Sequence, residues 1–134
     1  MPRTSPPSIA LASHAAGPIF LVSAAAASLY LMLPGPVVVE PWQAATFAGM
    51  TFPALIVGFV LSAIPNLVGS RLMVRAGEVR SWARAPLAWS AAGALVGGAL
   101  TGLTGAFSEP AAAFALVVTS ACCASICRVS VCWD

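Results

Sequence analysis

The sequence predicts an all-α fold, a single domain over residues 1–134 that forms an integral membrane bundle of four transmembrane helices with both termini in the cytoplasm. Three observations lead there. Hydrophobic residues make up 60% of the chain and charged residues only 7%, whereas about a quarter of a soluble domain is charged. The charged residues leave four long uncharged stretches, and the basic residues gather on one side of the resulting topology. With a mean hydropathy of +0.94, most of this chain requires lipid as its solvent.

The uncharged stretches set the number of helices. They lie between Arg3 and Glu40, Glu40 and Arg71, Arg84 and Glu109, and Glu109 and Arg128. A spanning helix needs about 20 apolar residues, so each stretch holds one helix and none comfortably holds two. The apolar runs are continuous rather than alternating, which argues against a β-barrel. We predict spans at residues 18–33, 46–69, 86–107 and 110–131, with a cytoplasmic arginine loop at 70–85.

Proline and glycine delimit the first span. Gly17 and Pro18 interrupt its apolar segment, and proline is well tolerated in a first helical turn, so the helix is expected to begin at Pro18. Residues 9–16 either extend it past a kink or lie along the interface. The Leu-Pro-Gly-Pro run at 33–36 should end it. A cleaved signal peptide over residues 1–27 is a minority alternative that would leave three spans.

Helix-breaking residues also shape the later spans. In the second span Pro65 frees a carbonyl, and Asn66 beside it is a candidate polar lining residue. Capping of a frayed helix end explains Asn66 at least as well, and we favour it. Gly77 is expected to end the helical run after the second span. Ser108 is the expected N-cap of the fourth span, followed by Glu109 as a favourable first-turn anion.

The arginines predict the orientation. They are Arg3 before the first span, Arg71, Arg75, Arg80 and Arg84 between the second and third, and Arg128 after the fourth. The opposite side carries Glu40 and Glu109 and no basic residue, so the positive-inside rule places both termini in the cytoplasm. The four arginines of the loop also suit anionic lipid headgroups. The absence of lysine, with abundant alanine, glycine and proline, suggests a bacterial cytoplasmic (inner) membrane.

The third span contains the most specific pattern, a row of small residues at four-residue spacing. The row consists of Gly93, Gly97, Thr101 and Gly105, with Gly98 and Gly102 beside it. Small residues at this spacing form a glycine zipper, which lets another helix backbone approach closely. Packing inside the bundle is slightly favoured over an oligomer interface. In the second span Gly58 and Ser62 form a weaker pair that is expected to receive this row.

The cysteines give no clear chemistry. Cys122, Cys123, Cys127 and Cys132 all lie at the cytoplasmic end of the fourth span, where thiols stay reduced. One helix with this spacing cannot surround a metal ion tetrahedrally, so no metal site is expected. We interpret the cysteines as small apolar residues, with redox sensing or lipid attachment as minority alternatives. His14, the single histidine, has no carboxylate within sequence reach and is interpreted as an interfacial or tail residue.

Missing motifs exclude several function classes. No charged residue lies in the middle of a predicted span, which argues against proton-coupled transport. The chain has no nucleophile elbow, paired-carboxylate site or phosphate loop, so we expect no catalytic residue, no cofactor and no enzymatic activity. A net charge of +2 is too small to indicate nucleic-acid binding.

Two function hypotheses remain. The leading one is a small structural or accessory membrane protein that associates through the glycine face of the third span, either with itself as a homo-oligomer or with a larger membrane complex. The alternative is a passive channel or small-solute transporter subunit, lined by serine, threonine and asparagine side chains. The alternative requires that Thr101 or Asn66 face water.

Overall fold

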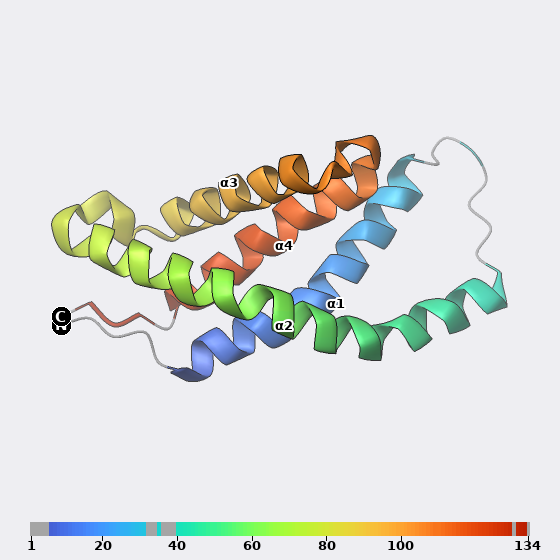
Figure 1. The fold of residues 1–134 in the computed structure, drawn as a ribbon, viewed down its shortest axis with the longest axis horizontal. Helices are drawn as coiled ribbons and strands as arrows, with labels where there is room; N and C mark the ends of the chain where they lie inside the picture. The colour runs from blue at the N-terminus through green and yellow to red at the C-terminus, as the bar shows by residue number, and fades with distance from the viewer. Residues whose placement is uncertain (1–5, 32–34, 36–39, 130, 134) are drawn as a thin grey trace.

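The computed structural model describes residues 6–31, 35, 40–129 and 131–133, and this part of the chain is helical without a strand (Figure 1). The elements are α1 (Pro6–Leu31), α2 (Pro41–Val79), the 3₁₀ turn η1 (Ser81–Arg84), α3 (Pro86–Thr104), the 3₁₀ turn η2 (Ala106–Ser108) and α4 (Pro110–Val129). All four α-helices are long and apolar enough to span a membrane. The predicted all-α architecture with four such helices is therefore confirmed.

The helices are arranged in the spatial order α3, α4, α1, α2. Helix α4 packs against both α3 and α1, and α1 packs on its other side against α2. The fully described helices α2 and α3 make no comparable contact with each other. Figure 1 shows α3 and α4 running side by side, whereas α2 crosses α1. The two outer helices therefore border a concave space whose floor is α1 and α4.

Helix α1 is longer than predicted. It begins at Pro6 rather than Pro18 and continues without interruption through Gly17 and Pro18 to Leu31. Proline removes one backbone hydrogen bond, but Ala12 and Ser13 are buried before it in contacts with the other helices. These contacts hold the segment in helical form, so residues 9–16 belong to the same helix. Most of the predicted stop at 33–36 lies outside the described residues.

Helix α2 also differs from prediction at both ends. It runs for 39 residues with Pro53 and Pro65 in its interior, a length of about 58 Å. It continues through Gly77 to Val79, so the first ten residues of the expected loop at 70–85 are helical. Gly77 is buried beneath the Trp133 ring, where a side chain would not fit, and it does not end the helix. The expected capping role of Asn66 is wrong, because the helix extends well beyond it.

The turn between α3 and α4 is set by one glycine. Gly105 adopts a left-handed conformation (φ 69°), the only positive φ among the described residues, and ends α3 at Thr104 instead of 107. Gly105 therefore terminates the helix and does not extend the glycine row. Ser108 donates its hydroxyl hydrogen to the Gly105 carbonyl at 3.1 Å, a bond back into η2, whereas its predicted role was to cap α4. Helix α4 ends at Val129, close to the predicted 131.

Candidate functional site

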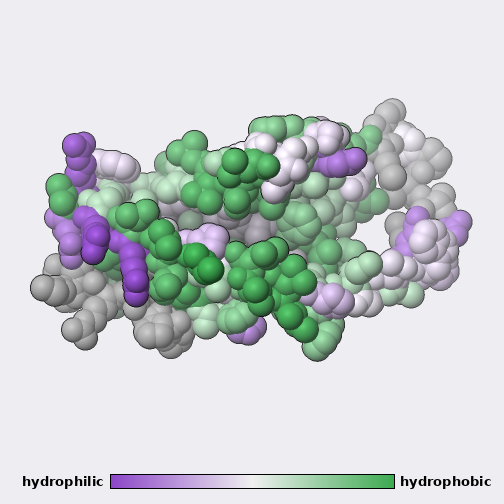
Figure 2. Space-filling model, in the orientation of Figure 1, coloured by the Kyte–Doolittle hydropathy of each residue, from purple (hydrophilic) through white to green (hydrophobic). Residues whose placement is uncertain are grey.

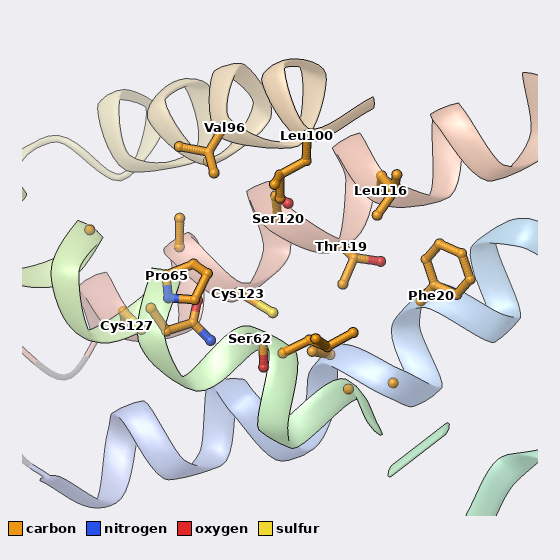
Figure 3. Close-up of a pocket in the computed structure, with 18 of the residues that line it drawn as sticks. Phe20, Ser62, Pro65, Val96, Leu100, Leu116, Thr119, Ser120, Cys123 and Cys127 are labelled. Carbon is orange, nitrogen blue, oxygen red and sulfur yellow. The ribbon is translucent and has the colours of Figure 1, made fainter. Parts of the chain in front are cut away.

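The concave space between α2 and α3 is a groove with a volume of about 730 Å³, lined by residues of all four helices. Figure 3 shows Val96 and Leu100 entering it from α3, Pro65 from α2 and Leu116 from α4. Lining residues on α2 extend from Met50 to Met73, a rise of about 35 Å along a helix. The groove is therefore long and mainly apolar.

One end of the groove is closed by the buried core. Trp89 is 1% exposed, and its indole N–H donates to the Ala83 carbonyl at 2.9 Å. Trp89 and Cys127 line the groove and also belong to the buried apolar cluster that includes Val131. The groove therefore ends against this cluster on the side of η1.

Polar side chains join three helices at the floor of the groove. The Asn66 amide donates to the Ser13 hydroxyl at 3.3 Å, and the Ser62 hydroxyl donates to the Ser13 carbonyl at 3.3 Å. The Cys123 thiol donates to the Ala12 carbonyl, also at 3.3 Å. These contacts connect α2 and α4 to the same turn of α1. Asn66 thus lines the groove and at the same time forms part of a helix junction.

Thr119 provides a hydroxyl in the groove that has no partner. Its Oγ1 atom is buried and forms no hydrogen bond within the described part of the chain. Thr101, on the adjacent helix, instead donates to the Gly97 carbonyl at 2.8 Å. A buried unsatisfied hydroxyl costs about 1–3 kcal/mol. Figure 3 shows the Thr119 side chain projecting from α4 into the space toward α1.

The glycine row of α3 is covered by α4. A Cβ atom at Gly93 would lie 2.4 Å from the Ser120 carbonyl oxygen, and one at Gly97 would lie 2.7 Å from the Val117 Cα. Thr101 in the same row is 1% exposed. In this structure the face that the leading hypothesis uses for association with another chain is therefore occupied from within the same chain.

The neighbouring glycines do not share this contact. A Cβ atom at Gly98 would meet no atom within 4 Å, and one at Gly102 would meet only the Phe107 ring, at 3.5 Å. The structure therefore uses Gly93, Gly97 and Thr101 for close helix packing and leaves the second row open.

A second close contact, which the sequence analysis missed, joins α1 to α2. A Cβ atom at Gly17 would lie 2.0 Å from the Ala54 carbonyl oxygen, and one at Gly58 would lie 2.6 Å from the Gly17 Cα. The expectation that Gly58 receives the glycine row of α3 is wrong, because it contacts α1. Ser13 and Gly17 have the same four-residue spacing that identified α3, but the Gly17-Pro18 pair was interpreted as a helix break.

Among the residues that the structure describes, the cysteines and the other possible ligands do not gather into a metal centre. Cys123 and Cys127 are buried, Cys122 is half-buried and Cys132 is exposed, and all four are free thiols. The described residues contain no group of three or more metal-ligating side chains. His14 lies on α1, where its ring contacts the Phe59 ring at 4.5 Å and its Nδ1 atom lies 2.8 Å from the Ala10 carbonyl oxygen.

The arginines divide into two kinds. Arg71, Arg75 and Arg80 are exposed, and their side chains form no hydrogen bond or ion pair with the described residues. The Arg84 Nε atom donates to the Gly77 carbonyl at 2.8 Å, and the Arg128 Nε atom donates to the Arg84 carbonyl at 2.5 Å. Arg128 was considered only as a marker of orientation, but the structure places it beside Arg84.

No protein-family model, curated protein or solved structure matches this chain.

Proposed function

We propose that this chain is an integral membrane protein of a bacterial cytoplasmic membrane, with both termini in the cytoplasm. The four apolar helices support insertion. The start of α1, η1 and the end of α4 lie at one end of the molecule, which is where the described arginines gather (Figure 1). Figure 2 shows strongly hydrophilic side chains at that end and a hydrophobic middle. Basic residues favour the cytoplasmic face, so this end faces the cytoplasm.

Within the membrane, the protein acts as an accessory subunit, and its groove holds one transmembrane helix of a larger membrane protein. The observation that carries this proposal is the separation of α2 and α3, which leaves a groove open along its side. Its length of about 35 Å along α2 matches a bilayer core of about 30 Å and a helix of about 20 residues. The docking surface is thus the groove and not the covered glycine row of α3.

The groove lining suits a helix. Gly69 lines it and has open space where a Cβ atom would be, so another backbone can approach there. On the side of the groove opposite Gly69, Ala92 and Ser120 have small side chains that leave room for a helix. Helices in lipid associate by close backbone packing, which the small residues Gly69 and Ala92 of the groove lining permit. This function requires no catalytic group and no cofactor.

Photo-crosslinking in the native membrane tests the proposal. A photoreactive residue at Val96, which lines the groove, should crosslink to one discrete protein larger than this chain. The same residue at Leu95, which is 77% exposed and outside the groove, should label lipid only. The partner should also co-purify in a one-to-one ratio with the unmodified chain.

A blocking variant completes the test. Ala92→Phe should fill the groove and abolish both the crosslink and the co-purification, whereas Gly98→Phe, on the same helix in open space, should preserve both. Equal labelling from Val96 and Leu95, or co-purification that survives Ala92→Phe, would contradict groove docking. A crosslink to a second copy of this chain would replace the accessory role by self-assembly.

The alternative, a passive channel or transporter subunit, receives less support. Asn66 lines the groove, but Thr101 is buried against α4 and bonded to its own helix. The groove also ends against the cluster around Trp89. A water path would have to pass through that cluster, which contains the largest fully buried side chain of the described residues.

A further inference from the structure

We propose that Arg84, Arg128 and Trp133 form a binding site for a phosphate group at the η1 end of the molecule. The site is separate from the groove, and of the proposed function it uses only the orientation that puts this end at the cytoplasmic membrane surface.

The site is assembled from three separate segments. The Arg84 guanidinium carbon lies 5.1 Å from the centre of the Trp133 ring, and that of Arg128 lies 5.7 Å from it. Arg84 comes from η1, Arg128 from the end of α4 and Trp133 from the segment that follows α4. Two like charges thus share one aromatic ring, which stabilises each by a cation–π contact of about 0.5–2 kcal/mol.

Backbone carbonyls fix both guanidinium groups. Arg84 bonds through Nε to Gly77, and Arg128 bonds through Nε to Arg84 and through Nη1 to Val131 at 3.3 Å. A guanidinium has five N–H donors, so each arginine keeps several donors for a ligand. Fixed arginines bind the oxygens of phosphate more strongly than mobile ones, because less side-chain freedom is lost on binding.

The position of the Trp133 ring depends on Gly77 of α2. A Cβ atom at Gly77 would lie 2.2 Å from Cη2 and 2.8 Å from Cζ3 of the Trp133 ring. The indole therefore rests directly on the helix backbone at this point. Its Nε1 atom is buried and has no acceptor within the described part of the chain.

The charge balance leaves both guanidinium groups available to an anion. Neither Arg84 nor Arg128 forms an ion pair with a carboxylate among the described residues, and Glu78, the acid nearest to Arg84 in sequence, is exposed without such a contact. Two fixed guanidinium groups combine positive charge with spare donors. A phosphate group offers negative charge and several acceptor oxygens. At a membrane surface its source is an acidic phospholipid, and in solution it is free phosphate.

Native mass spectrometry of the full chain in non-ionic detergent tests this site, with phosphatidylglycerol as the acidic lipid and phosphatidylcholine as the zwitterionic one. We expect one tightly bound phosphatidylglycerol. Arg128→Gln should lower the affinity for phosphatidylglycerol about tenfold or more, since a charge-assisted hydrogen bond is lost. Arg75→Gln, which removes the same charge from an exposed position on α2, should change this affinity less than twofold.

A glycine pair gives a second test that retains every arginine. Gly77→Ala should displace the Trp133 ring and lower the affinity for phosphatidylglycerol about as much as Arg128→Gln does. Gly49→Ala, on the same helix in open space and outside the groove, should leave the affinity unchanged. If either variant fails to fold, competition on the unmodified chain decides. Inorganic phosphate should displace the lipid better than chloride at equal ionic strength.

Three results would overturn the site. An equal loss of lipid affinity in Arg75→Gln and Arg128→Gln would show that the lipid responds to the overall positive charge and not to a defined site. Equal affinity for both lipids, with no binding of inorganic phosphate, would show that the site does not select an anion, because phosphatidylcholine carries the same phosphodiester group with its charge neutralised by choline. A large gain in affinity in Asp134→Asn would show that the chain's own carboxylate is the anion; Asp134 lies outside the described residues. Tight binding of inorganic phosphate without preference for acidic lipid would assign the same site to a soluble phosphate compound.

Discussion

The α3–α4 pair and the α1–α2 pair both use glycine for close approach, but they have different shapes. Along α3, Gly93 and Gly97 lie one turn apart and both face the backbone of α4. Between α1 and α2, Gly17 and Gly58 meet at one point. A row of small residues keeps two helices together over several turns, whereas glycines that meet at a crossing let two helices diverge beyond it. Figure 1 shows both outcomes.

The groove follows from this difference. Because α3 stays close to α4 and α2 crosses α1, the outer helices α2 and α3 separate along their length. The large apolar side chains of the early part of α2 are exposed, among them Met50 at 54% and Phe52 at 71%. One pair thus serves as the scaffold, and the other sets how far the groove opens.

The largest effect is expected at Gly97. Gly97→Ala should lower the free energy of unfolding by about 3 kcal/mol, because the new methyl group meets the α4 backbone, which cannot move aside locally. The neighbouring Gly98→Ala should raise it by about 0.5 kcal/mol, since alanine favours a helix and finds open space. Unfolding in mixed detergent measures both. Destabilisation of similar size at both positions would mean that α3 does not face α4 through this row.

A smaller loss is expected at the α1–α2 crossing. Gly17→Ala should cost about 2 kcal/mol; although the clash with Ala54 is closer, α2 can tilt at the crossing to relieve it. Gly49→Ala on α2 meets no atom within 4 Å and is the control. The same unfolding assay applies. If Gly17→Ala proved more damaging than Gly97→Ala, the crossing and not the α3–α4 pair would be the scaffold.

The smallest effect is expected from the polar junction. A double-mutant cycle of Ser13→Ala and Asn66→Ala should give a coupling energy of about 0.6 kcal/mol, the usual size of an interhelical hydrogen bond in membrane proteins. Unfolding of the two single variants and the double variant supplies the cycle. A coupling energy near zero would mean that the close contact of Gly17 with Gly58, and not this hydrogen bond, holds α1 and α2 together.

Prediction from the sequence was accurate where one property of the chain decides the outcome. Four uncharged stretches were enough to predict four helices, and the start of α3 at Pro86 and of α4 at Pro110 agree with the predicted spans. It was inaccurate at Pro18 and Gly77, where tertiary contacts outweigh local preference. For the groove it identified Asn66 but not Thr119, because a threonine in an apolar helix carries no local sign of lacking a hydrogen-bond partner.

By itself, the sequence determined that this chain is all-helical, that four segments are apolar enough to span a membrane and that its arginines favour one end. These properties depend on composition and on spacing along the chain. Only the tertiary structure decided which glycines are covered, that α2 and α3 stay apart and that Arg84, Arg128 and Trp133 meet. The physical reason is that each of these features joins residues distant in sequence, and helices of similar apolarity can pack in many orders. Close backbone contacts at Gly17, Gly58, Gly93 and Gly97 select the order found here.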